Sequence, residues 1–178
     1  MLSHLDTANP VLVQEGEDVE LVLIAWENIP ERLQNIYNSR EPIFVTRNNI
    51  ILFWLDPFGM VWRIFIKKGF ISDRASIPWP ARIIGIGRSN RTNWMDLGSL
   101  PHDAVYRGAG SFCDNRSMNR FLADRLMLDL WVYRAGRKTL PRVKYSVQRA
   151  FGGFVFRPDP TAHSDDVVQI TSYGMIRG

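Results

Sequence analysis

The chain has 178 residues, of which 46% are hydrophobic and 12% aromatic, so it can form the core of one domain with extensions, and global disorder is excluded. The single cysteine, Cys113, excludes an internal disulfide framework and a cysteine-rich zinc site. No apolar run approaches the roughly 18–20 residues that span a bilayer, and the first residues lack the basic and apolar regions of a signal peptide. We therefore expect no transmembrane segment and synthesis in the cytoplasm.

Charge is unevenly distributed along the chain, whose net charge is +4. Residues 1–42 carry eight acids against two bases, and residues 116–149 carry nine bases against two acids. Such asymmetry is compatible with nucleic-acid binding, with packing of one part of the chain on the other, or with acid-to-base contacts between copies. We do not expect a nucleic-acid partner, because the bases are spread around predicted helices and no basic strand with interleaved aromatics is present.

The N-terminal part is predicted to contain an arm, a strand and a short helix. Residues 1–18 are polar and contain proline, which favours an extended arm. Val19–Trp26 is β-branched and apolar, as is typical of a strand. A short amphipathic helix begins at Pro30 and ends before Pro42, since proline has no amide hydrogen to continue a helix.

A β-hairpin is predicted next. Its strands are Asn49–Leu55 and Met60–Ile66, which are rich in Trp, Phe and Ile, so at least one face of the sheet is expected to be buried. Residues 56–59 (DPFG) suit a type I turn, with proline second and glycine last.

Residues 69–80 (GFISDRASIPWP) are predicted to form a structured loop, because they contain a glycine and two prolines. Asp73 and Ser76 are among its few side-chain oxygen groups. They either cap a turn by accepting bonds from backbone amides or contribute to a site. We do not expect Ser76 to be a nucleophile, because no Gly-x-Ser-x-Gly elbow surrounds it.

Three helices are predicted after this loop, at about 95–107, 116–135 and 139–151. Gly136 marks the end of the second helix. The apolar surface of that helix is assigned to Phe121, Leu122, Leu126, Leu128, Leu130 and Trp131. Residues 157–178 have little core-forming capacity and are predicted to be a tail.

The predicted fold class is therefore α+β. A small antiparallel β unit, with its hairpin near 49–66, is followed by three helices, and extended arms stand at both termini. The expected regions are an N-terminal arm, strand and short helix at 1–42, a core domain at 43–156, and a C-terminal tail at 157–178.

His102 is the main candidate for chemistry, because imidazole titrates near neutral pH. In the run HDAVYR it precedes Asp103, shares a helical face with Tyr106, and is followed by Arg107. Asp124 lies 22 residues later on the next helix, and antiparallel packing of the two helices can bring it against His102. A carboxylate bonded to one ring nitrogen leaves the other nitrogen to take a proton from water.

Three interpretations of these residues stay open. His102 and Asp124, with an arginine, can form a buried polar network that pins two helices. They can instead form a hydrolytic site. In the third interpretation a metal binds without catalysis, since Asp103 would be free to hold a hard cation such as calcium, with carbonyl groups or Asp73. No cofactor other than this calcium is predicted.

The set His102, Asp103, Tyr106 and Asp124 resembles the His-Asp helix pair of the phospholipase A2 superfamily, in particular its small bacterial members. The resemblance implies that His102 acts as general base and Asp124 orients it. Two features depart from that pattern. The supporting disulfides cannot form with one cysteine, and no glycine-rich calcium loop is recognisable.

A longer resemblance covers residues 60–156, where a hairpin strand is followed in order by GFISDRASIP, HDAVYR, ADRLML and AFGG. This order is similar to the phage and prophage family called domain of unknown function 1353, and the resemblance implies a phage origin. Arg74 stands where that family usually has glycine. An arginine there strains a left-handed backbone or blocks a ligand that approaches it.

The leading functional hypothesis is a structural or accessory component of a tailed-phage virion, in the tail or baseplate. It would be made in the host cytoplasm, and its extensions would dock on other virion proteins or on copies of itself. The alternative is a metal-assisted hydrolase acting on a lipid ester or peptidoglycan of the host envelope. In that case His102 is the base, Asp124 orients it, and Asp103 with Asp73 lies near the metal.

Overall fold

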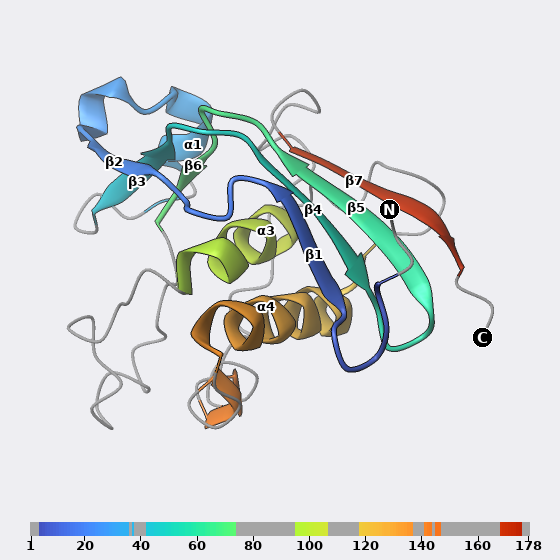
Figure 1. Ribbon diagram of the computed structural model, residues 1–178. Helices are drawn as coiled ribbons and strands as arrows, with labels where there is room; N and C mark the ends of the chain where they lie inside the picture. The colour runs from blue at the N-terminus through green and yellow to red at the C-terminus, as the bar shows by residue number, and fades with distance from the viewer. Residues whose placement is uncertain are drawn as a thin grey trace.

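The structure, a computed structural model, describes residues 4–35, 37, 42–73, 95–106, 118–136, 141–143, 145–146 and 168–175. These residues form a four-stranded and a three-stranded antiparallel sheet together with helices, which confirms the predicted α+β class (Figure 1).

The predicted hairpin forms the centre of the larger sheet. Its strands are β4 (Ile50–Leu55) and β5 (Met60–Ile66), paired in register from Ile50↔Ile66 to Leu55↔Val61. The turn closes through a bond from the Gly59 N–H to the Asp56 carbonyl oxygen, at 3.1 Å. The Asp56 carboxylate also accepts two backbone N–H bonds within the turn and the indole N–H of Trp62 at 2.9 Å. A turn at the predicted position is therefore confirmed, and its type I geometry stays a prediction.

Both terminal segments contribute a strand to this sheet. Strand β1 (Val11–Glu15) pairs with β4, and β7 (Val168–Met175) pairs with β5, which gives the order β1-β4-β5-β7. The expectation that residues 157–178 add little to the core was wrong for the first part of β7, because Val168 and Ile170 are buried in the main core. The sequence also predicted an extended arm over residues 1–18, and five of those residues are a paired strand.

The smaller sheet has the order β2-β3-β6, with β2 (Leu21–Ile24), β3 (Ile43–Thr46) and β6 (Ile71–Ser72). A 3-10 turn, η1 (Trp26–Asn28), and the short helix α1 (Glu31–Gln34) connect β2 to β3. The helix α1 lies within the range that the sequence predicted, whereas η1 was not predicted and includes Trp26, the last residue of the predicted strand. A separate small core lies beneath them and consists of Ile29, Leu33, Tyr37, Ile43 and Ile71.

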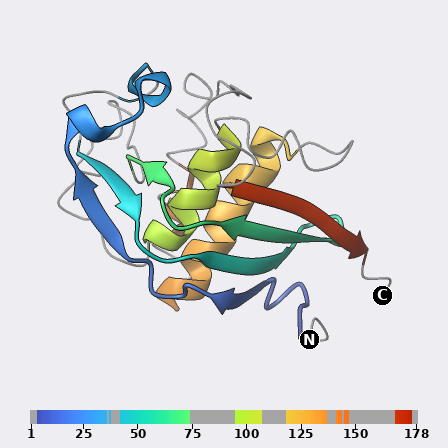
Figure 2. The ribbon, with the colours of Figure 1, turned by 90° about the horizontal axis from the view of Figure 1, so that it is seen from above.

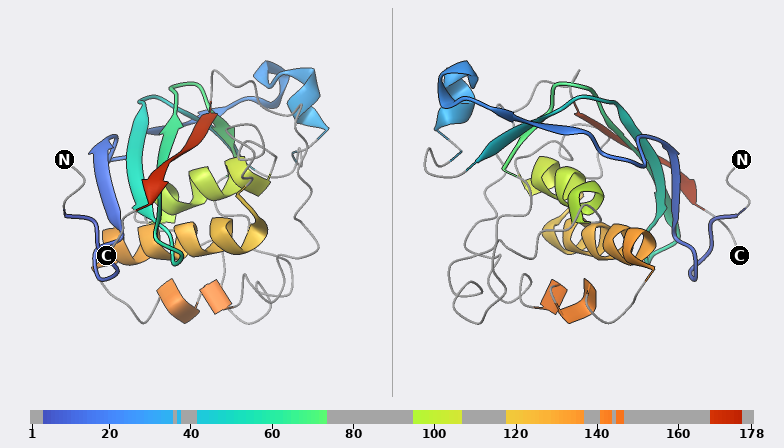
Figure 3. Two further views of the ribbon diagram at one scale, coloured as in Figure 1. Left: turned by 90° about the vertical axis from the view of Figure 1, so that its right-hand side faces the viewer. Right: turned by 60° about the vertical axis from the view of Figure 1, so that its left-hand side comes forward.

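Two helices cover one face of the larger sheet (Figures 1 and 3). They are α3 (Asp96–Tyr106) and α4 (Arg120–Ala135), which lie within the ranges predicted for the first and second helix. The side chain of Asn119 caps α4 by accepting the Leu122 N–H at 3.0 Å. Gly136 ends it with a left-handed backbone (φ 57°), as predicted. Of the third predicted helix, residues 141–143 and 145–146 are described and are helical.

The main core lies between the sheet and these helices. Alternate residues of β4 and β5 face it because side chains alternate across a strand: Ile50, Leu52, Trp54, Met60, Trp62, Ile64 and Ile66. From the helices it includes Leu97, Leu100, Leu122, Leu126 and Leu130. The assignment of Phe121 to the apolar face of α4 was wrong. Phe121 is 38% exposed, with its ring centroid 6.2 Å from that of Phe58 at the hairpin turn.

Candidate functional site

The packing of α3 against α4 brings His102 onto Asp124. The ring Nε2 of His102 lies 3.0 Å from Oδ1 of Asp124, so the contact that helical spacing predicted is confirmed. His102 is 4% exposed and Asp124 is 1% exposed. The two helices approach closely nearby because Gly98 has no side chain. A Cβ at this position would lie 2.7 Å from Trp131 on α4.

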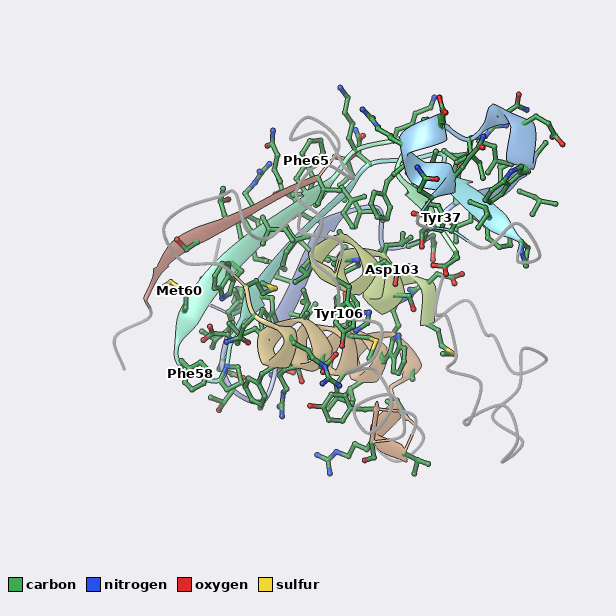
Figure 4. All side chains as sticks on the ribbon, turned by 180° about the vertical axis from the view of Figure 1, so that it is seen from behind. Tyr37, Phe58, Met60, Phe65, Asp103 and Tyr106 are labelled. Atoms are coloured by element: carbon green, nitrogen blue, oxygen red, sulfur yellow. The ribbon has the colours of Figure 1, made fainter. Side chains whose placement is uncertain are left out.

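Asp124 is the centre of a group of donors. The Tyr106 hydroxyl donates to Oδ1 of Asp124 at 2.5 Å, and Tyr106 projects from α3 toward α4 (Figure 4). Arg120 Nε lies 3.6 Å from the other oxygen, Oδ2, and donates to the Tyr106 oxygen at 3.3 Å. The rings of His102 and Tyr106 stack with centroids 4.0 Å apart. Both oxygens of the buried carboxylate therefore face positive or donating groups.

Asp103 links the helix pair to the smaller sheet. Its Oδ2 accepts the hydroxyl of Ser72, on β6, at 2.6 Å. Its Oδ1 lies 3.7 Å from Nδ1 of His102, longer than a hydrogen bond but close enough for charge attraction. His102 therefore sits between two carboxylates, one at each ring nitrogen. We call His102, Asp103, Tyr106, Arg120 and Asp124 the His102 cluster.

The surroundings of His102 shift the pKa of its imidazole ring. Burial acts to lower the pKa of His102, and the carboxylates of Asp103 and Asp124 outweigh burial, so the pKa lies above its ordinary value near 6.5. For Tyr106, burial and the bond to Asp124 both raise the pKa of the phenol, which stays protonated as the donor. The cluster therefore favours an imidazolium ion held between two anions.

This arrangement has two chemical uses. As an imidazolium, His102 joins both carboxylates and fixes the position of α3 on α4 and β6. As a neutral imidazole, His102 donates its Nε2–H to Asp124 and has a lone pair on Nδ1. That lone pair can accept a proton from water, as in a general base. The raised pKa of His102 favours the first state, and its 4% exposure leaves little access for a substrate beside Nδ1.

The predicted calcium ligands are only partly described. Asp103 uses one carboxylate oxygen on Ser72, and Asp73 follows Ser72 at the end of β6. Within the described residues, no three His, Cys, Asp or Glu side chains converge to hold a metal ion. The described residues thus do not fit a calcium site by themselves, and calcium binding stays a prediction.

Several residues singled out in the sequence lie outside the described residues. These are Arg74, Ser76, Arg107 and Cys113. The motifs GFISDRASIP and AFGG lie wholly or partly there as well. The roles predicted for these residues stay predictions.

Two contributors to the site and one further polar contact of α4 were missed from the sequence. Arg120 precedes Asp124 by four residues on one helix, so the spacing of opposite charges is a signal that finds it. Ser72 carries no such signal, because its bond to Asp103 joins residues 31 apart. On the same helix, Asp129 accepts the indole N–H of Trp54 from β4 at 3.0 Å and ties α4 to the larger sheet.

The charge asymmetry of the sequence has an intramolecular counterpart. Arg134, near the end of the basic helix α4, pairs with Asp18 at 2.5 Å and with Glu17 at 3.3 Å. One part of the acidic N-terminal region therefore lies against one part of the basic region, as one of the sequence interpretations required.

The chain matches no protein-family model, no curated protein and no solved structure. Among the described helices, none has the length and apolar character needed to cross a membrane.

Proposed function

We propose that this protein is a structural component of a tailed-phage particle, in the tail or baseplate. The order of four motifs in the sequence supports the phage assignment by resemblance. The observation that carries the structural role is the enclosure of His102, which is 4% exposed and faces a carboxylate at each ring nitrogen. A residue held in this way is suited to fixing helices more than to meeting a substrate.

The position of the His102 cluster agrees with a scaffold role. Its bonds join three elements that are distant in sequence, since Ser72 lies on β6, His102 on α3 and Asp124 on α4. A part that bears load in an assembly benefits from such directional contacts, because hydrophobic burial alone is not directional.

Purification of particles from cells that produce the phage encoding this chain tests the proposal. We expect the chain to co-purify with intact particles through a density gradient, at a fixed ratio to the tail proteins in quantitative mass spectrometry. A tail-tube protein and a cytoplasmic phage enzyme serve as positive and negative controls. If the chain stays in the soluble lysate and is absent from particles, the structural role is wrong.

A second candidate function is hydrolysis of a lipid ester or of peptidoglycan in the host envelope. The observation that favours it is the 3.0 Å contact between His102 Nε2 and Asp124, with Tyr106 donating to the same carboxylate oxygen. Asp124 would hold the imidazole, and Nδ1 would take the proton of an attacking water. Asp103 and Asp73 are the predicted metal ligands.

Assays of the purified chain test this candidate. The substrates are fluorescent phospholipid vesicles and dye-labelled peptidoglycan sacculi, each with added calcium and with EDTA. A hydrolase would release product in a manner that His102→Gln abolishes and that Asp129→Asn, a change on α4 outside the His102 cluster, leaves intact. Equal background release by wild type and His102→Gln would rule the hydrolase out for these substrates.

A further inference from the structure

The outer edge of β2 is unpaired within the part of the chain that the structure describes. In the order β2-β3-β6, β2 has one neighbouring strand among the described residues and lies along the outer side of the smaller sheet (Figures 1 and 2). The Arg47 N–H donates to the Glu20 carbonyl oxygen, so Glu20 and Val22 direct their backbone groups to β3. Because bonding alternates along an antiparallel pair, Leu21 and Leu23 direct their N–H and C=O groups to the open edge.

Two of the four apolar side chains of β2 are exposed. Leu23 is 63% exposed and Val22 is 37% exposed, and as neighbours in a strand they point to opposite faces. Edge strands are usually protected by lysine, proline or a bulge, and β2 (LVLI) pairs regularly with β3 and has none of these. The edge therefore combines outward backbone groups with apolar side chains, which are the two requirements for the addition of a strand.

The region around β2 is strongly acidic. Residues 11–31 contain six acids and no base. Glu17 and Asp18 pair with Arg134. The other four acids are exposed and form no ion pair within the described residues: Glu15, Glu20, Glu27 and Glu31. Two of the four flank β2, one on each side, so the open edge has negative charge at both ends.

We propose that β2 is a docking edge for an extended segment of another protein, which adds beside β2 as a further strand. The segment has apolar residues in its middle and lysine or arginine at both ends. Bonds to the backbone of Leu21 and Leu23 supply the pairing, and Glu20 and Glu27 select the basic ends. The inference rests on the assembly role proposed above, and it names the surface and the chemistry of the partner.

Charge disfavours a second copy of this chain as the occupant. An antiparallel pair that bonds Leu21 of one copy to Leu23 of the other brings Glu20 of one copy and Glu27 of the other to the same end. Acids would then lie near acids at both ends of the new pair, and like charges that lie close together repel one another. A segment with basic ends removes this repulsion.

Fluorescence anisotropy with synthetic peptides tests the docking edge. The probe is a labelled peptide that alternates valine and threonine and ends in a lysine pair on each side. One control peptide ends in glutamate pairs, and the other has N-methyl groups along one edge, which removes its backbone donors. We expect the lysine-ended peptide to bind about tenfold or more tightly than either control.

Variants of the chain locate the binding. Leu23→Pro removes an N–H that faces the open edge and leaves the bonds between β2 and β3 in place, so the sheet tolerates it. We expect it to weaken binding by about fivefold or more, with an unchanged circular dichroism spectrum. Leu23→Val, which keeps the N–H, is the matched control. The double change Glu20→Lys and Glu27→Lys should reverse the preference toward the glutamate-ended peptide.

Three results would overturn the proposal. The first is no binding of the lysine-ended peptide to wild type, and the second is equal binding to folded Leu23→Pro. The third is self-association of wild type in sedimentation that Leu23→Pro abolishes, which would assign the edge to a second copy. If the chain is missing from particles and the peptide still binds, the assembly role alone fails. If the chain is in particles and the peptide does not bind, the docking edge alone fails.

Discussion

Replacing Asp124 with asparagine separates the charge of the His102 cluster from its shape. The substitution keeps the size of the side chain and removes the anion that faces His102, Tyr106 and Arg120. The amide of asparagine also presents an N–H₂ group where one carboxylate oxygen had accepted a bond. At 1% exposure, the Asp124 side chain is shielded from bulk water, which therefore does not replace what is lost.

The size of the effect follows from these contacts. Breaking a buried ion pair by removing one partner costs about 3–5 kcal/mol, because the remaining charge stays buried without compensation. A domain of this size unfolds with a free energy of about 5–15 kcal/mol, so the Asp124→Asn variant loses a large part of its stability. Each kcal/mol lowers the melting temperature by about 2–4 °C, which gives a total decrease of about 6–20 °C.

Urea unfolding followed by circular dichroism measures this loss, and the matched control is Asp129→Asn. Asp129 is also buried on α4, but its arginine partner, Arg125, is 43% exposed, and an asparagine there can still accept the Trp54 indole N–H. We expect the control to lose about 1 kcal/mol. If Asp124→Asn loses no more than Asp129→Asn, the His102 cluster does not hold α3 to α4.

Three further outcomes are expected. Because its folded-state pKa is raised, His102 stabilises the fold fully below its ordinary pKa and less as the pH rises through the folded-state pKa. The difference in unfolding free energy between wild type and His102→Gln should therefore narrow as the pH rises above the ordinary pKa of 6.5, and a constant difference would contradict this. Gly98→Ala places a Cβ 2.7 Å from Trp131 and should cost about 1–3 kcal/mol in urea unfolding followed by tryptophan fluorescence, whereas an unchanged midpoint would show that the helices can separate freely. Arg134→Ala breaks an exposed ion pair and should cost less than about 1 kcal/mol, decreasing with added salt, so a larger loss at high salt would refute the surface assignment.

The parts of the fold that the sequence predicted depend on local chemistry. The hairpin was predictable because a DPFG turn lies between two apolar strands, and these residues are contiguous. The contact between His102 and Asp124 was predictable because two successive helices pack side by side, which limits the partners of a residue on either one. In both cases the signal and the structure involve neighbouring segments.

The parts that were missed depend on pairing between distant segments. Strand β1 pairs Val11 with Trp54, and β7 pairs Val168 with Ile66, across about forty and a hundred residues. The terminal segments are largely polar, and only alternate residues of each strand are apolar and face the core. Their local sequence therefore does not show that they pair with the edges of the sheet. The exposure of Phe121 was missed because helical spacing defines a face and does not determine where the sheet above it ends.

The polar bonds of the core connect elements that hydrophobic packing alone would allow to slide. Trp54 of β4 donates to Asp129 of α4, His102 of α3 meets Asp124 of α4, and Ser72 of β6 donates to Asp103 of α3. Each bond has one length and one direction, so together they fix the position of both helices relative to both sheets. These bonds are distributed from one sheet to the other and are not gathered at one exposed position. Their distribution favours a rigid scaffold over a local catalytic centre, and this makes the exposed acidic edge at β2 the place to look for a partner.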